Sequence, residues 1–377
     1  MSNDHPNILL VQLFSNGDCL YATAVARQIK NDYPGCRLTW AIAGFCKDII
    51  SENLYVDDVL ITDAVKKNDV AAFRKYKRDI FAEKTAGKWD EVFVTSNMDT
   101  NLALYDGTIR GMILRAYPHP VSVPLQPVLQ LRKEETECVA AFAEVNKLKT
   151  FKHVILWEYA PQSGQSTLSF EFVMSIAKKL AASPDTCVIL SSASSFSSTP
   201  QIIDASVLSL RENAALTHYC TLLVGCSSGI TWITTSTAAK FLPMLQLLNS
   251  QAYFINAPSV DFKRYHIEHN GLIEMSSFTE EKVLSCIEEI LHNGFSAALH
   301  FNEELPLQFN TTKKIVYNLL VYREFSAIKK HMQLMVSIYG RHPLLLKAFF
   351  SALAGAPFKL VKNRWKKGPG KNKNAQH

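Results

Sequence analysis

The 377-residue sequence lacks the patterns that mark disulfide frameworks, zinc sites and membrane spans. Its eight cysteines are scattered singly, without a Cys-x-x-Cys pair or a Cys/His group at zinc spacing, so we expect a reducing cytoplasm. No Asp-x-Asp motif and no histidine pair at metal spacing occurs, and we expect no essential metal. Neither a run of about 20 uncharged apolar residues nor a signal peptide is recognisable, so no spanning helix is predicted.

Glycine and proline are also sparse, with 15 of each, while hydrophobic residues make up 47% of the chain and charged residues 20%. This composition excludes a disordered, collagen-like or low-complexity protein. At roughly 100–200 residues per domain, the length indicates two folded domains and leaves room for a third.

Acidic residues are missing from the end of the chain. The last one is Glu324, and eleven Lys and Arg residues follow it, which leaves 29 basic against 34 acidic residues in positions 1–325. The net charge of +6 therefore belongs to one tail, and we expect no nucleic acid partner for the folded body.

Short apolar runs alternate with amphipathic stretches along most of the chain, which predicts doubly wound parallel sheets. Two similar α/β halves are expected, followed by helices over 312–325 and 327–339 and a basic tail. We place the boundaries at 1–148, 149–300 and 301–377. The strands predicted in the first half cover residues 7–14, 37–43, 56–61 and 91–95. Those predicted in the second half cover residues 152–157, 186–190, 206–210, 221–225, 241–247 and 251–255.

Two turns between a strand and the next helix stand out as candidate sites, because ligands bind at the carboxyl ends of parallel strands. The first is Ser15-Asn16-Gly17-Asp18. Asp18 fits two interpretations: a helix N-cap, which is the commoner role of a lone Asp here, or a general base.

The second turn runs from Gly225 to Gly229 and opens a helix predicted over residues 229–239. Its small residues allow a ligand close to the backbone, and N–H groups with the hydroxyls of Ser227 and Ser228 suit a phosphate. Ser-Ser-Gly is equally common in ordinary loops.

Residues 8–61 resemble the N-terminal half of glycosyltransferase family 9, the heptosyltransferases. The shared pattern is an apolar strand, a Ser-x-Gly-Asp turn, a helix, a Tyr-Pro-Gly break and a strand containing Trp, here at residues 9–13, 15–18, 22–29, 33–35 and 38–41. Residues 215–247 resemble the family's strand, Gly-x-Asp-Ser/Thr-Gly turn, helix and strand, and the similarity extends over most of residues 7–292.

The resemblance implies a GT-B architecture, in which two Rossmann-like domains face a cleft, and a metal-independent inverting transfer from a nucleotide sugar without a bound cofactor. Asp18 falls on the family's proposed catalytic base, and Ser15, Asn16 and Gly17 form its turn on the acceptor side. The family's donor-diphosphate positions fall on Ser227, Ser228, Gly229, Trp232 and Gln165.

Three of these donor positions depart from the family. Its Asp is Ser227, its His is Trp232, and its phosphate-contacting Lys is Gln165. Weaker polar candidates follow the predicted strands or gather in a basic cluster. They are Asn97, Asp99, Asp106, Glu158, Lys263, Arg264, His266 and His269.

The C-terminal residues 344–361 have an apolar face and precede Lys362, Arg364 and Trp365. Such a segment suits the surface of an anionic bilayer, and packing on the body followed by a disordered end is the alternative. A lipid-linked acceptor would favour attachment to the inner face of a bacterial inner membrane.

The leading hypothesis is a glycosyltransferase that adds a sugar to lipopolysaccharide or a related surface glycan. A nucleotide-sugar epimerase with the same two-domain shape is one alternative. A dinucleotide-dependent oxidoreductase is disfavoured because the first turn lacks Gly-x-Gly-x-x-Gly. The departures at the donor positions motivate a third reading, a non-catalytic transferase fold that acts as an assembly partner.

Overall fold

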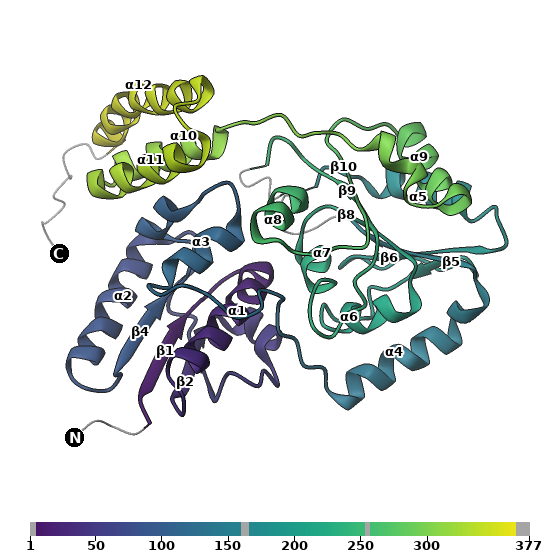
Figure 1. Ribbon diagram of the computed structural model, residues 1–377, viewed down its shortest axis with the longest axis horizontal. Helices are drawn as coiled ribbons and strands as arrows, with labels where there is room; N and C mark the ends of the chain where they lie inside the picture. Colours follow the sequence, from purple (N-terminus) through teal and green to yellow (C-terminus); the bar gives the residue numbers. More distant parts are fainter. Residues whose placement is uncertain (1–4, 160–165, 253–256, 367–377) are drawn as a thin grey trace, which may run out of the picture. The chain divides into compact units, whose positions relative to one another are not determined.

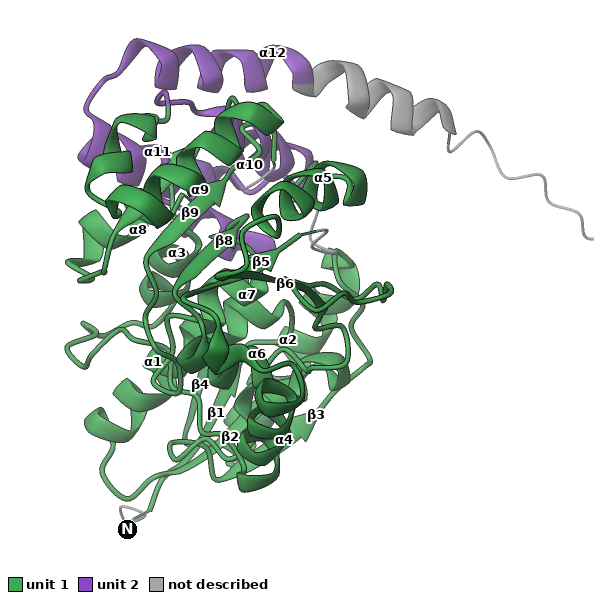
Figure 2. Cartoon of the chain, turned by 90° about the vertical axis from the view of Figure 1, so that its right-hand side faces the viewer, with its two compact units in different colours: residues 1–97, 107–305 green, residues 98–106, 306–377 purple. Residues whose placement is uncertain are grey.

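The structure is a computed structural model that describes residues 5–159, 166–252 and 257–366, with side chains described to residue 355 in the last helix. Figure 1 traces the chain and labels its elements. The chain divides into two compact units, one of residues 1–97 and 107–305 and the other of residues 98–106 and 306–377, coloured separately in Figure 2. The predicted boundaries at residues 148 and 300 are not tested by this division and stay predictions.

The first sheet of the larger unit has four parallel strands in the order β3-β2-β1-β4. They are β1 (Asn7–Val11), β2 (Arg37–Ile42), β3 (Asp58–Ile61) and β4 (Glu91–Val94). The helices that follow in the same part of the chain are α1 (Asn16–Asp32), α2 (Val70–Thr85) and α3 (Ile109–Ala116). Ile8 of the central strand β1 lies opposite Leu38 on one side and Glu91 on the other, and β1 is buried. This burial is what a short, continuous apolar run predicts.

The second sheet has six parallel strands in the order β10-β9-β8-β5-β6-β7. They are β5 (His153–Glu158), β6 (Thr186–Ser191), β7 (Ile202–Asp204), β8 (Leu222–Gly225), β9 (Met244–Leu247) and β10 (Leu272–Met275). The helices of this half are α4 (Lys133–Val145), α5 (Phe170–Leu180), α6 (Glu212–Leu216), α7 (Gly229–Ile233), α8 (Pro258–Tyr265) and α9 (Glu280–Asn293). Helices α5 and α9 pack side by side over one core (Figure 1), and Thr279 caps α9 by accepting the N–H of Lys282.

The smaller unit combines a short 3₁₀ helix, η2 (Asp99–Leu104), with three helices from the end of the chain. These are α10 (Asn310–Val321), α11 (Phe325–Tyr339) and α12 (Pro343–Lys366). Buried His331 of α11 hydrogen-bonds through Nδ1 to the carbonyl of Ala103 at 3.2 Å, and Tyr339 donates to the carbonyl of Asp106 at 2.9 Å. Residues more than 220 positions apart in sequence thus form one folded unit.

The helix predicted at 312–325 ends earlier, at Val321, and the strand predicted at 241–247 begins later, at Met244. Two other predicted elements differ more. The strand predicted at 206–210 is wrong, because β7 ends at Asp204, whose carboxylate accepts the N–H and the hydroxyl of Ser206 and turns the chain. The helix predicted at 229–239 ends at Ile233, because Thr237 pairs its N–H with the carbonyl of Pro127 instead of continuing the helix. The predicted strand at 251–255 falls largely outside the described residues.

Candidate functional site

Asp18 lies in the first turn of α1, directly beyond the carboxyl end of β1. Its carboxylate is buried, with 9% of the residue exposed. Asn97, which follows the neighbouring strand β4, donates from Nδ2 to Oδ2 of Asp18 at 2.6 Å. The two residues meet because parallel strands β1 and β4 end at the same edge of the sheet.

Burial raises the pKa of Asp18 to about 7, while the positive charge of Lys67 and the hydrogen bond from Asn97 act in the lowering direction. Desolvation dominates because the charged carboxylate loses more hydration than these two groups restore. A carboxyl group with this pKa is partly ionised near neutral pH, so it can accept a proton, and it is basic enough to keep the proton once accepted.

The backbone in both candidate turns adopts a conformation that L-residues rarely take. Ser15 has a φ of 67° and Ser227 a φ of 55°. Non-glycine residues in this region carry strain that the surrounding structure must stabilise, and such positions cluster at functional sites. Ser15, the N-cap residue of α1, makes no capping hydrogen bond with its side chain.

The second turn encloses a carboxylate of the chain itself. Glu158, the last residue of β5, is 2% exposed. One of its oxygens accepts the Ser228 hydroxyl and the Ile230 N–H at 2.9 Å. The other accepts the hydroxyl of Thr231 at 2.7 Å and the N–H groups of Thr231 and Cys226 at 3.2 and 3.4 Å.

Gln246 of β9 completes the packing of this turn. Its side-chain oxygen accepts the N–H of Ser227 at 2.8 Å and the hydroxyl of Thr231 at 3.2 Å. A Cβ at Gly225 would collide with the side chains of both Thr231 and Gln246, so this position requires glycine. The turn therefore holds the Glu158 carboxylate and the Gln246 amide oxygen in its interior.

Trp232 is buried and packs toward the first half of the unit. Its ring contacts Tyr21 of α1 edge-on with centroids 5.1 Å apart. Its Cδ1 lies 3.8 Å from where a Cβ on Gly17 would stand, and its Nε1 donates to the carbonyl of Ser227 at 3.3 Å. Trp232 thus bridges the two candidate turns, a packing role that its sequence position does not indicate.

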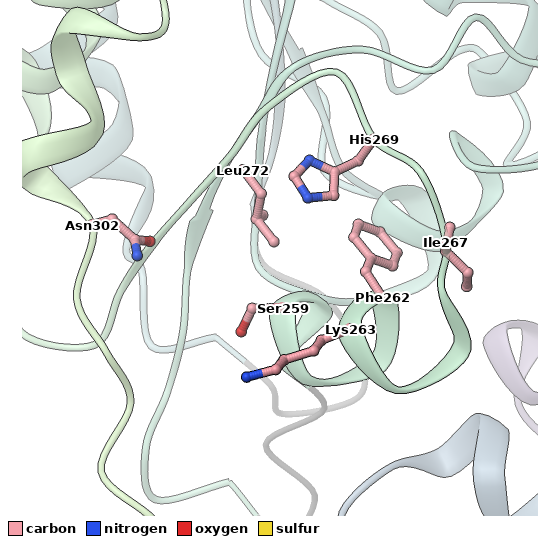
Figure 3. Close-up of a pocket in the computed structure, with 7 residues that line it drawn as sticks. All are labelled: Ser259, Phe262, Lys263, Ile267, His269, Leu272 and Asn302. Carbon is pink, nitrogen blue, oxygen red and sulfur yellow. The ribbon is translucent and has the colours of Figure 1, made fainter.

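The remaining candidates belong to other segments of the chain. Asp99 and Asp106 are buried and belong to the smaller unit. Gln165 lies outside the described residues. Lys263 and His269 line a surface pocket of about 240 Å³ on α8 (Figure 3), whose lining contains neither Asp18 nor any residue of the second turn.

No group of three or more His, Cys, Asp or Glu side chains suited to a metal occurs within the described part of the chain. Across the same residues, no helix has the length and apolar character that crossing a membrane requires.

Comparison with known proteins rests on structure. No protein-family model matches this sequence, and no curated protein matches it significantly. A glycosyl transferase of family 9 from Veillonella parvula superposes with a TM-score of 0.56 at 14% identity, covering 78% of this chain and 99% of that one. The E. coli ADP-heptose lipopolysaccharide heptosyltransferase II superposes with a TM-score of 0.52 at 14% identity, and the match covers 76% of this chain and 99% of that one.

These matches confirm the predicted α/β architecture with two parallel sheets. At this identity they establish the fold, while the chemistry must be argued from the residues. The chain has the GT-B fold of the family 9 heptosyltransferases.

Proposed function

We propose that this protein is an inverting, metal-independent glycosyltransferase that uses Asp18 as its general base. The observation that carries the proposal is the buried Asp18 carboxyl group beyond the end of β1. Its pKa is raised to about 7, and it accepts a hydrogen bond from Asn97. The N-cap residue of α1 is Ser15 and not Asp18. A raised pKa would also serve no purpose in a residue that only caps a helix.

In the proposed reaction, a hydroxyl of the acceptor attacks the anomeric carbon of the donor sugar from the face opposite the leaving group. Asp18 takes the hydroxyl proton as the new carbon–oxygen bond forms. The bond between the anomeric carbon and the phosphate oxygen breaks, and its electron pair leaves with the nucleoside diphosphate. Asn97 fixes Oδ2 of Asp18, so we assign proton transfer to Oδ1.

On the donor side, we propose that Ser227, Ser228 and Gly229 hold the leaving diphosphate, with Trp232 and Gln165 beside it. Backbone N–H groups and hydroxyls stabilise a departing anion without a metal. One structural neighbour is by name an ADP-heptose lipopolysaccharide heptosyltransferase. From it we infer the substrate classes only: a nucleotide sugar as donor and a lipopolysaccharide or related glycan as acceptor.

The experiment is a screen of ADP-, UDP-, GDP- and CMP-sugars for thermal stabilisation, followed by transfer assays on lipopolysaccharide acceptors. Asp18→Asn should lower kcat by roughly 100-fold or more, because general-base catalysis contributes that much. Asp32→Asn makes the same change at the other end of α1 and is the matched control. Unchanged turnover in a folded Asp18→Asn protein would remove Asp18 from the mechanism.

We further propose that the protein works on the inner face of a bacterial inner membrane, attached through α12. Two faces of this helix support the proposal. Leu345 and Ala352 are buried within the smaller unit, whereas Leu346, Phe350 and Leu353 are exposed, with 61% of Phe350 accessible. Residues spaced by four and three share one side of a helix.

The occupant proposed for this outer face is an anionic bilayer. Eleven Lys and Arg residues and no acidic residue follow Glu324. This positive charge attracts negatively charged lipid and disfavours a protein partner that has few acidic residues. Membrane attachment would keep the enzyme beside a lipid-linked acceptor.

A second candidate function is a non-catalytic assembly partner with a transferase fold. The specific observation that favours it is the filled turn at Glu158, whose donors are already engaged. This candidate predicts no stabilisation by any nucleoside diphosphate or nucleotide sugar, whereas the transferase requires it. An epimerase would turn over a nucleotide sugar without an acceptor, so the same screen tests that reading as well.

A further inference from the structure

Glu158 binds the Ser228 hydroxyl and the N–H groups of Cys226 and Ile230, in the same turn to which the proposed function assigns the donor's diphosphate. We propose that its carboxylate is a built-in competitor for this turn: a diphosphate binds to residues 226–231 only by displacing Glu158. This inference rests on the proposed donor site and adds a residue that sets its affinity for the donor.

The first argument is that the turn is built to hold an anion. Three backbone N–H groups and two hydroxyls converge on the two oxygens of one carboxylate. Within the described residues, Glu158 forms no salt bridge with a Lys, Arg or His side chain. Hydrogen-bond donors alone therefore compensate a buried negative charge, as they do at phosphate sites.

The second argument is that this site has no room for two anions. Glu158 is 2% exposed, and even a methyl group at Gly225 would collide with Thr231 and Gln246. A diphosphate beside an undisplaced Glu158 would meet a like charge in a low-dielectric environment and find the donors taken. Exchange of one anion for the other keeps these five donors hydrogen-bonded.

The third argument is a spare donor in the packing of the same turn. Nε2 of Gln246 is buried and has no hydrogen-bond partner among the residues that the structure describes, although its Oε1 accepts from Ser227 and Thr231. A buried unpaired N–H group is costly. A diphosphate has more acceptor oxygens than a carboxylate, so it offers this amide the partner that Glu158 does not provide.

The test measures binding of inorganic pyrophosphate and of ADP, UDP and GDP by titration calorimetry, without any transfer step. Glu158→Gln removes the negative charge with little change in shape and should tighten pyrophosphate binding at least ten-fold. Glu158→Asp keeps the charge but shortens the side chain. Its affinity for pyrophosphate should therefore lie between those of Glu158→Gln and the parent protein. Glu158→Asp also keeps the proposal testable if the Gln variant does not fold.

Glu274→Gln is the matched control. Glu274 is also a buried carboxylate of the same sheet, and it accepts the N–H and hydroxyl of Ser259 at 2.7 and 2.6 Å, away from this turn. Its substitution should leave pyrophosphate affinity unchanged.

The proposal is overturned if both Glu158 variants bind pyrophosphate no more tightly than the parent protein does. It is also overturned if Glu274→Gln gains as much affinity for pyrophosphate as Glu158→Gln. The proposed function fails separately. Full activity of Asp18→Asn would disprove the base assignment without altering the pyrophosphate result, because that assay contains no acceptor and no sugar.

Discussion

Nε of Arg110 lies 2.7 Å from Oδ2 of Asp261, and the side chains of both residues are almost fully buried, at 1% and 0% exposed. Arg110 belongs to α3, which follows the four-stranded sheet, and Asp261 belongs to α8, between strands of the six-stranded sheet. The guanidinium also donates to the carbonyl of Leu125 at 2.7 Å and lies 4.4 Å from the ring centre of Tyr21. This ion pair joins the two sheet-bearing halves of the larger unit.

Asp261→Asn should lower the free energy of unfolding by about 3–5 kcal/mol, because it leaves the Arg110 charge buried without its counter-ion. Urea denaturation followed by circular dichroism measures the change. Glu137→Gln is the control, since Glu137 pairs with Lys133 on the exposed surface of α4, where such pairs contribute little. Similar losses in both variants would contradict a special role for the buried pair.

Asp18→Asn should stabilise the protein at alkaline pH although it slows transfer. Burial raises the pKa of Asp18 from 3.8 to about 7, so between these values the folded protein binds a proton that the unfolded chain releases. Stability therefore falls as pH rises through this window, and the neutral amide removes that loss. Tm measured at pH 5 and pH 8 should show the larger gain at pH 8, and an equal gain at both would argue against a raised pKa.

Asn97→Ala should move the acidic limb of the kcat/KM profile to higher pH. The Asn97 hydrogen bond favours the ionised form of Asp18 and lowers its pKa against the effect of burial. Without it, a larger fraction of Asp18 is protonated at neutral pH. A pH–rate profile separates this positioning role from general loss of structure, since partial unfolding would lower the rate without moving the limb.

Stability of the smaller unit should decline below about pH 6.5 because of His331. Desolvation lowers the pKa of this buried imidazole from 6.5 to about 4, so the unfolded chain takes up the proton first as pH falls. The His331 contribution is complete above pH 6.5 and is lost toward pH 4.

His331→Gln keeps a donor for the Ala103 carbonyl and should flatten this pH dependence, measured as unfolding of the helices by circular dichroism. His300→Gln, in which an exposed histidine is replaced, is the comparison. A decline of the same size in His331→Gln would assign the acid sensitivity to other groups.

Vesicle binding should depend on the outer face of α12. Replacing Leu346, Phe350 and Leu353 together by Ser should weaken binding to phosphatidylglycerol-containing vesicles at least ten-fold, since apolar burial and charge act jointly at such a surface. The parent protein should not bind purely zwitterionic vesicles. Equal sedimentation of both proteins with anionic vesicles would exclude this face as the contact.

The sequence was sufficient to predict the two parallel sheets, the strands from β1 to β6 and the turn that presents Asp18. These features are local: a short apolar run makes a buried strand, and a Gly-containing break makes a turn wherever the rest of the chain lies. The edge strand β10 and helices α3 and α8 were missed because their patterns are short and weak.

The tertiary structure alone decided what fills the second turn and what joins the halves. Glu158 and Ser228 are 70 positions apart, and Arg110 and Asp261 are 151 apart. No local pattern distinguishes a carboxylate that ends a strand facing solvent from one that enters a neighbouring turn. Asp18 had two sequence interpretations for the same reason: its residue type was visible, whereas the burial that raises its pKa comes from residues brought together only by folding.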